Sequence, residues 1–345
     1  MSRPPLWKQV TTTLEAELAK GRFKPGDRFY SLKDLSLQYR ISEITGRRVL
    51  DELRGKNLID SFQGRGTFVR RAPVARDLKL LLHPLLVEAG YSHQYLVQEV
   101  IQGVQSAARG AGCTAHLVST DHLASHLRQD DLVVTLWHSR HAEAIRLAVA
   151  HGARVVCAHA PEAVVGASTI GPDFAAGTAA AVRHLLDRGH RRIAYLTGPI
   201  GSVWFSARFD GYYQTLRRAG IACDLALVRE SPVEDGSDVG PLVDILLGLA
   251  APPTAVLCAN DGRALEVLRA CRARSVRVPE DLAVVGFDNT HDSALVTPAL
   301  TTVDQFWQRQ GAEAVALLLR HAEQVVRTPV ENIVIAPRLV IRASS

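Results

Sequence analysis

The stretch Ile41-Ser42-Glu43-Ile44-Thr45-Gly46-Arg47-Arg48-Val49-Leu50 decides the fold of the first quarter of this chain. The Ser42 hydroxyl can accept a hydrogen bond from the backbone N–H of Thr45, which predicts that a helix starts there. The residues expected to face a core, at roughly helical spacing, are Ile44, Val49, Leu50 and Leu53. The residues left to face outward are Glu43, Thr45, Arg47, Arg48 and Arg54. The pattern predicts an amphipathic helix with a basic outer face.

Another short helix is predicted just upstream, over residues 31–39, and Tyr39-Arg40-Ile41 is only long enough to turn a corner. Two helices joined in this way form a helix-turn-helix, which lays its second helix into the DNA major groove. Downstream, strand-like runs at 58–62 and 67–71 are joined by Gln63-Gly64-Arg65-Gly66. Its two glycines permit the positive φ angles of a tight hairpin. We interpret this hairpin as a wing with Arg65 at its tip.

Charge is distributed unevenly along the 345 residues, whose formal net charge is +5. Residues 1–76 contain 16 Lys and Arg against 8 Asp and Glu, a charge of +8, whereas the remainder contains 24 and 27, a charge of −3. A concentrated positive potential is where a polyanion would bind. The length favours a small head and a larger body, and we expect a DNA-binding domain at 1–71, a linker at 72–77 and a body at 78–345.

The N-terminus lacks an apolar segment typical of a secretory signal, and no apolar run approaches about 18 residues. We therefore expect a cytoplasmic protein without a membrane partner. The five cysteines are scattered, odd in number and without a Cys-x-x-Cys pair. This spacing favours reduced, mostly buried thiols over a disulfide or zinc framework.

Beyond the linker, apolar runs alternate with helix-like stretches. Strands are expected at 78–82, 115–119, 132–137, 154–158, 193–197, 225–229, 255–259 and 282–287. Helices are expected at 94–110, 140–151, 174–188, 206–219, 239–250, 261–273 and 306–325. This alternation predicts an α/β body with two doubly wound lobes, each with an open parallel sheet covered on both faces. Ligands bind such sheets beyond the carboxyl ends of the strands. The side chains expected there are Trp137, His138, His159, Trp204, Arg208, Asn260, Asp261, Asp288 and Asn289.

The first 71 residues resemble the winged-helix head of GntR-family transcription regulators. The resemblance rests on Pro5-Leu6-Trp7, Gly21, Pro25-Gly26-Asp27, Ser31, Ile41-Ser42, Thr45, Arg47-Arg48, Leu50, Leu53, Leu58-Ile59 and Gly64 to Val69. It implies DNA contacts by Lys33, Ser42, Glu43, Thr45 and Arg47, with Gly66 at the minor groove. Two residues depart from the family pattern: Glu43 replaces a usual Arg and Gly46 a usual apolar residue. Glu43 can accept a hydrogen bond from a cytosine amino group or pair with Arg47.

The body resembles the effector-binding domain of LacI-family repressors, a fold like that of periplasmic binding proteins. The residues that carry this resemblance are Asp173, Gly177, His184 to Leu186, Gly189 to Ala194, Arg208 to Tyr212, Asn260-Asp261, Val278 to Asn289 and Leu300 to Gln305. It is densest between 170 and 310. It implies effector contacts by Arg208, Asp288 and Asp261, and, more loosely, by Tyr95, Trp137 and Asp173. A GntR head on a LacI-type body is the arrangement of arabinose-responsive repressors.

Each of these residues also has an ordinary structural interpretation. The basic residues Lys33, Arg47, Arg48 and Arg65 could form a solvated face, with Arg48 paired to Glu52. Arg208 could pair with Asp210, and Asp261 and Asp288 could cap helices. Trp204 is either a surface residue or a platform on which a sugar face stacks.

Metal binding and catalysis have little support. His122 and His126 stand four residues apart beside Asp121, but no third ligand follows them, and we expect no metal and no cofactor. We find no nucleophile elbow or phosphate-binding loop, so we do not expect an enzyme. The sequence predicts a regulator, expected to be a repressor, that binds a palindromic operator as a homodimer and responds to a sugar-like effector. The alternative is a small-molecule sensor whose DNA affinity is nonspecific.

Overall fold

The structure is a computed structural model that describes residues 4–24, 26–56, 58–70, 77–82, 91–119, 127–136, 142–160, 162–231, 239–322 and 329–345. Two compact units are found. One consists mainly of Met1–Asp77 and is called the head; the other consists mainly of Leu78–Ala316 with Val330–Ser345 and is called the body. Each is described separately.

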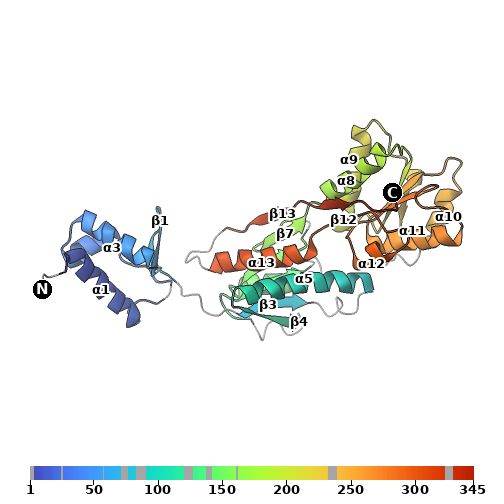
Figure 1. The fold of residues 1–345 in the computed structure, drawn as a ribbon. Helices are drawn as coiled ribbons and strands as arrows, with labels where there is room; N and C mark the ends of the chain where they lie inside the picture. The colour runs from blue at the N-terminus through green and yellow to red at the C-terminus, as the bar shows by residue number, and fades with distance from the viewer. Residues whose placement is uncertain are drawn as a thin grey trace. The chain divides into compact units, whose positions relative to one another are not determined.

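The head is built from three helices and a hairpin (Figure 1). They are α1 (Leu6–Ala19), α2 (Leu32–Tyr39), α3 (Glu43–Gly55), β1 (Ile59–Phe62) and β2 (Gly66–Val69). The strands pair antiparallel, with Ile59 opposite Val69 and Phe62 opposite Gly66. The core shared by all five elements contains Val10, Leu14, Phe29, Leu35, Ile41, Val49, Leu50, Leu53, Ile59 and Val69. The helix-turn-helix and the wing hairpin are therefore present as predicted.

One expected core residue is on the surface. The side chain of Ile44 is 85% exposed, so the prediction that it faces the core is wrong. The inward position on that turn of α3 belongs to Gly46, where an added Cβ would lie 3.1 Å from Cδ1 of Leu32. The glycine thus lets α2 pack closely against α3, and this packing turns Ile44 away from the core.

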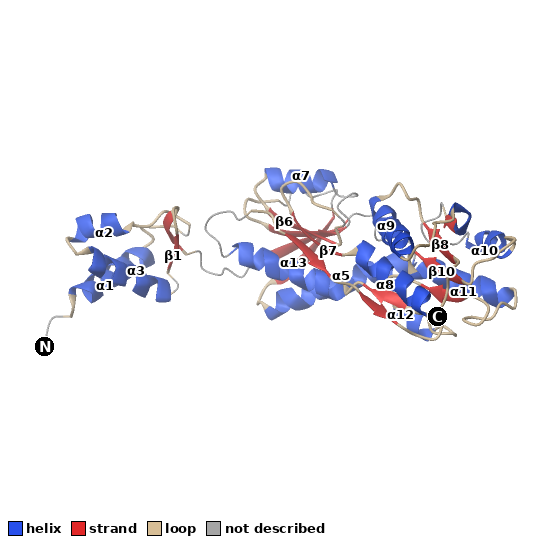
Figure 2. Ribbon diagram, turned by 90° about the horizontal axis from the view of Figure 1, so that it is seen from above, coloured by secondary structure: helices blue, strands red, loops and turns tan. Residues whose placement is uncertain are grey.

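The first lobe of the body contains a six-stranded sheet of order β13-β7-β6-β5-β3-β4. Its strands are β3 (Asp77–Leu82), β4 (Thr114–Ser119), β5 (Leu132–Leu136), β6 (Arg154–Ala158), β7 (Ser168–Pro172) and β13 (Asn332–Ile335). The registers from β13 to β3 are parallel. Figure 2 shows α7 (Ala142–Ala150) on one side of this sheet and α5 (Tyr91–Gly110) and α13 (Trp307–Ala322) on the other.

The second lobe contains a four-stranded parallel sheet of order β11-β10-β8-β9. Its strands are β8 (Ile193–Thr197), β9 (Val228–Glu230), β10 (Ala255–Cys258) and β11 (Ala283–Val285). One apolar cluster packs it against α10 (Val239–Leu247) and α11 (Asp261–Ala273), and another against α8 (Phe174–Asp187) and α9 (Val203–Arg218). Helices on both faces confirm the predicted doubly wound α/β architecture.

The remaining elements lie near the junction of the lobes. They are α12 (His291–Leu295) and the antiparallel pair β12 (Thr302–Asp304) and β14 (Arg338–Val340). Helices α5 and α13 approach closely at two glycines. An added Cβ at Gly103 would lie 2.0 Å from the carbonyl oxygen of Gln308, and one at Gly311 would lie 2.3 Å from that of Val100.

The sequence-based boundaries differ from the structure in the outer strands. Strands β7, β12, β13 and β14 were not predicted, and the expected strand at 225–229 is a 3-10 turn at Leu225–Leu227 followed by β9. All five cysteines are free, and Cys157, Cys258 and Cys271 are buried. Among the described helices, none is long and apolar enough to cross a membrane.

Candidate functional site

Two side-chain caps fix the helix-turn-helix. The backbone N–H of Thr45 donates to Oγ of Ser42 at 3.2 Å, and the two hydroxyls lie 2.9 Å apart. At the start of α2, the Ser31 hydroxyl accepts from the Asp34 N–H while the Asp34 carboxylate accepts from the Ser31 N–H. Each cap satisfies backbone donors that the helix leaves free. The first turn of α3 is therefore held in place before any ligand binds.

The two arginines of α3 have different surroundings. The guanidinium carbon of Arg48 lies 4.2 Å from the centroid of the Trp7 ring, an arrangement that holds the side chain against α1. Arg47 is exposed and forms no ion pair with any described residue. The expected pair of Arg48 with Glu52 is replaced by Lys56, whose Nζ lies 3.6 Å from the Glu52 carboxylate and 2.6 Å from that of Glu15. Arg47 is thus available to an external partner.

The other predicted DNA-contacting residues also lie on the surface of the head. Lys33, Glu43 and Arg65 are exposed, and Gly66 is half-buried. Gly64 and Gly66 have φ angles of +75° and +112°, so the hairpin uses the backbone freedom that its sequence predicted. The structure adds one basic residue that sequence reasoning missed, Arg28, whose Nε lies 3.4 Å from the position of a Cβ added at Gly66. Its nearest strand contact is a backbone bridge to Phe68.

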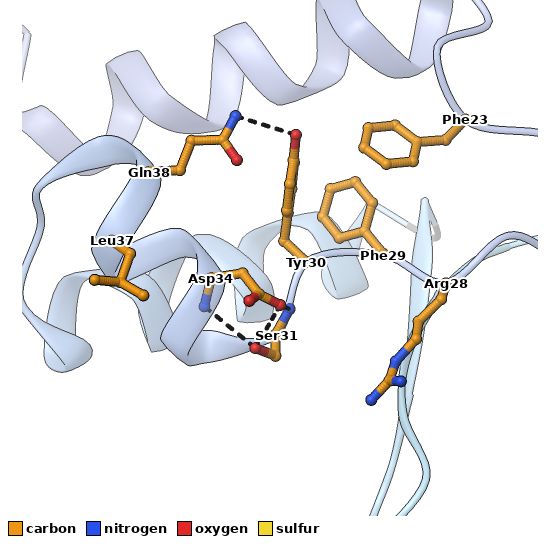
Figure 3. A pocket seen from close by; sticks show the side chains of 8 residues that line it. All are labelled: Phe23, Arg28, Phe29, Tyr30, Ser31, Asp34, Leu37 and Gln38. Carbon is orange, nitrogen blue, oxygen red and sulfur yellow. Dashed lines mark hydrogen bonds between the residues drawn. The ribbon is translucent and has the colours of Figure 1, made fainter.

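A shallow hollow beside α2 is lined by Phe23, Arg28, Phe29, Tyr30, Ser31, Asp34, Leu37 and Gln38, with a volume of about 820 Å³ (Figure 3). Its aromatic rings pack edge-on against one another, with 5.1 Å between the centroids of Phe23 and Phe29. Its polar groups bond internally: the Gln38 amide donates to the Tyr30 hydroxyl at 3.2 Å. These contacts brace α2 and leave no converging polar groups for a ligand.

In the body, Arg208 and Asp288 meet between α9 and the end of β11. Nη2 of Arg208 lies 3.8 Å from Oδ1 of Asp288, and both side chains are about 7% exposed. The guanidinium also lies over the rings of Phe174 and Phe287, at 4.8 and 4.5 Å. Burial raises the pKa of the Asp288 carboxyl to about 8, against the attraction of Arg208. Burial likewise lowers the pKa of the Arg208 guanidinium, so desolvation outweighs the attraction within the pair.

The backbone at this pair is strained. Asp288 has a φ angle of +134° and Asn289 one of +54°, a region that residues with a Cβ rarely occupy. Trp307 contributes to holding it, because its indole Nε1 donates to the Asp288 carbonyl oxygen at 3.1 Å. The Gln305 amide donates to Oδ1 of Asp288. Strain of this kind persists where the surroundings determine the conformation, and it concentrates at functional sites.

An aromatic cluster joins the two lobes beside this pair. The ring of His159, at the end of β6, stacks parallel to Trp204 of α9, with 5.1 Å between centroids and 4° between planes. It also lies 4.2 Å from Trp307 and edge-on to Phe174 at 5.3 Å. Nδ1 of His159 is 3.2 Å from the Gln310 amide oxygen. A flat apolar wall from three elements thus stands next to a buried charge pair.

Two buried polar atoms here have no hydrogen-bond partner among the described residues: Nε of Arg208 and Oε1 of Gln305. One is a donor and the other an acceptor. Leaving such atoms unpaired costs about 1–3 kcal/mol each. A small molecule with one acceptor and one donor would satisfy both.

The remaining predicted effector residues have other partners. The Asp261 carboxylate is fully buried and accepts hydrogen bonds from the Thr290 N–H at 2.8 Å, the Thr290 hydroxyl at 3.1 Å and the Thr302 hydroxyl. Asp173 caps α8 by accepting from the Ala176 N–H at 2.8 Å. Tyr95 is half-buried on α5, and its phenol pKa is raised by that burial and by Glu99.

Several predictions fall outside the described residues: Trp137 and His138, and the histidines His122 and His126 considered as metal ligands. Within the described ranges, no group of three or more His, Cys, Asp or Glu side chains could hold a metal ion. Sequence reasoning missed Trp307 and Gln310. Both lie on the last helix, whose start carries no strand-end signal that would have assigned them to the site.

Comparison with known proteins matches the two units separately. Residues 6–69 match the model of the bacterial regulatory proteins of the gntR family. Residues 182–345 match the model of the periplasmic binding protein-like domain. Both matches agree with the resemblances drawn from the sequence.

Among curated proteins, the chain is similar to the HTH-type transcriptional repressor PurR of Mannheimia succiniciproducens, at 37% identity over 163 residues, covering 47% of this chain and 48% of that protein. The PurR repressor of Pasteurella multocida is 35% identical over 168 residues, covering 48% of each chain. The chain spans about half the length of the curated relatives that it matches.

Among solved structures, the chain is similar to a LacI family transcriptional regulator from Mycobacterium smegmatis, with a TM-score of 0.63 and 27% identity over 78% of this chain and 98% of that one. A LacI family regulatory protein from Chloroflexus aggregans has a TM-score of 0.67 at 22% identity, over 79% and 99%, and supports the fold. The relatives named here are transcriptional regulators, and none is an enzyme.

Proposed function

We propose that this chain, which joins a GntR-family head to a periplasmic-binding-protein-like body of the LacI type, represses transcription by binding operator DNA under the control of a small polar effector. The observation that carries the proposal is the capped helix α3, which presents Arg47 to solvent without an ion pair among described residues. A preformed helix with an unengaged arginine at its N-terminal end is what base reading in the major groove requires. The curated relatives are repressors, which supports the direction of control.

The DNA step is proposed to use a homodimer acting in the cytoplasm. Two-fold symmetry would place two α3 helices in major grooves about one helical turn apart, on a palindromic operator. Arg47 is suited to a bidentate contact with guanine, and Glu43 to accepting from cytosine. Lys33, Arg48 and Arg65, with Ser42, Thr45 and Gly66, would contact the DNA backbone or the minor groove.

The effector is proposed to bind between the lobes. Arg208 Nε can donate to it and Gln305 Oε1 can accept from it, since both are buried without partners among described residues. Asp288 would hold Arg208 in place, and Trp204 would offer a flat apolar face on which a sugar ring can stack. Tyr95, Trp137, Asp173 and Asp261 remain predicted contacts. A sugar or sugar derivative has the required mixture of hydroxyl donors, acceptors and an apolar face.

Control requires that the effector bind one arrangement of the lobes better than another. His159 of the first lobe stacks on Trp204 of the second, and its Nδ1 lies beside Gln310 of α13. A ligand at Arg208 would rearrange these contacts between lobes. The resulting change in lobe closure would favour or disfavour the dimer geometry that fits the operator.

Selection of bound DNA from a random pool, followed by gel-shift measurement, tests the DNA step. We expect enrichment of a two-fold sequence that binds more tightly than unrelated duplex at the same salt concentration. Steep salt dependence without any enriched sequence would instead support a sensor with nonspecific DNA affinity.

A thermal-shift screen of sugars, sugar acids and nucleosides on the whole chain tests the effector step. Arg208→Ala should abolish the largest shift found. The matched control is Arg217→Ala, an exposed arginine further along the same helix, which should leave the shift unchanged. An unchanged shift in Arg208→Ala would place the effector elsewhere.

A further inference from the structure

Ile44 is an apolar side chain with no place in the core of the head. It is 85% exposed, whereas Val49, Leu50 and Leu53 of the same helix are at most 7% exposed. It stands second in α3, directly after the Ser42 cap and Glu43. A single exposed apolar residue is ordinary on most surfaces. Its position at the amino end of this helix is what gives it meaning.

The direction in which Ile44 points is fixed by the packing of α3. Gly46 faces inward against Leu32, which sets the rotation of the helix about its axis. Residues three apart share one face of a helix, so Ile44 lies on the same face as Arg47. Both are exposed, and Arg47 has no ion pair among described residues. The outward face of the first turns therefore combines an apolar group with a free guanidinium.

We propose that Ile44 reads the C5-methyl group of a thymine in each operator half-site. This inference rests on the proposed DNA binding and adds to it a residue that determines specificity. The thymine methyl is the distinctive apolar group in the major groove, and the first residues of a recognition helix are those that contact base edges. An isoleucine cannot donate to or accept from the other base edges, so it discriminates only for that methyl.

The spacing of α3 places this thymine relative to the guanine assigned to Arg47. Three residues of helix rise about 4.5 Å, and stacked bases are separated by about 3.4 Å. The thymine is therefore one or two base pairs from the guanine. The acceptor Glu43 next to Ile44 would add a cytosine or adenine amino group on the neighbouring pair.

Deoxyuridine in place of thymine tests the proposal, because it removes only the methyl group. Within the operator selected by the wild-type chain, one such replacement in each half-site should weaken binding about fourfold, the equivalent of about 0.8 kcal/mol for one buried methyl. Ile44→Ala should bind the unmodified operator more weakly and lose nothing further on that replacement. Because Ile44 is exposed, the melting temperature of the head should be unchanged.

The matched control is Leu37→Ala, which removes an apolar side chain that is 72% exposed on α2. This variant should keep the full sensitivity to deoxyuridine. The proposal is overturned if no deoxyuridine replacement weakens the wild type, or if Ile44→Ala remains as sensitive as the wild type. Failure of the wild type to select any sequence is a separate result, which would overturn the proposed function instead.

Discussion

Arg47 and Arg48 form a natural pair for testing how the head reads DNA. They are adjacent, equally charged and both exposed, so replacing either by alanine removes the same long-range attraction. They differ in their contacts, because Arg48 lies 4.2 Å from the Trp7 ring and Arg47 is unengaged by described residues. We expect only Arg47 to carry sequence information.

A good bidentate contact between arginine and guanine contributes about 1–3 kcal/mol of discrimination. Arg47→Ala should therefore reduce the ratio of operator to nonspecific affinity by about 5-fold to 150-fold. Arg48→Ala should weaken binding to all duplexes alike and lower the slope of log affinity against log salt by about one contact. Losing the stacked Trp7 contact should also cost the head about 0.5–1 kcal/mol of stability.

The assay is fluorescence anisotropy with the selected operator and a scrambled duplex, repeated across a series of salt concentrations. Thermal melting of both variants separates binding from folding. The reasoning is refuted if Arg48→Ala loses as much specificity as Arg47→Ala, or if Arg47→Ala keeps the wild-type ratio of affinities.

Three further predictions concern stability. Ser42→Ala removes the cap of α3 and should cost the head about 1 kcal/mol in denaturant unfolding; an unchanged midpoint would contradict the cap. Because burial raises the pKa of Asp288 to about 8, the folded chain holds that proton more tightly than the unfolded chain, so stability should fall as pH rises from about 4 through 8, and Asp288→Asn should flatten this slope in melts across pH. Gly311→Ala, whose Cβ would lie 2.3 Å from the Val100 carbonyl oxygen, should destabilise the body by several kcal/mol in denaturant titration, whereas Gly110→Ala, with nothing within 4 Å, should not.

The sequence predicts the head well because local signals there agree. Ser31 and Ser42 start helices as caps, and Gly64 and Gly66 make the turn that their positive φ angles need. Ile44 breaks the pattern, since periodicity cannot distinguish it from a core residue when the neighbouring Gly46 is the residue that faces inward. That choice depends on how α2 packs against α3, which is a tertiary contact.

The body illustrates the same limit at its binding site. Arg208 and Asp288 were found because strand ends in parallel sheets mark ligand sites. Trp307 and Gln310 were not, because they come from the last helix and meet His159 only through the packing of the two lobes, more than 140 residues away in the chain. Strand β13 was missed for a similar reason: it pairs with β7 across a long separation in sequence.

Operator affinity measured with and without a saturating effector tests the central claim most directly. With a ligand chosen by the thermal-shift screen, we expect the affinity of the intact chain for its operator to change by about 5-fold to 150-fold, the usual range of coupling between two sites. Arg208→Ala should bind the same operator and show no change on adding the ligand. Equal operator affinity of the wild type with and without bound ligand would contradict the account.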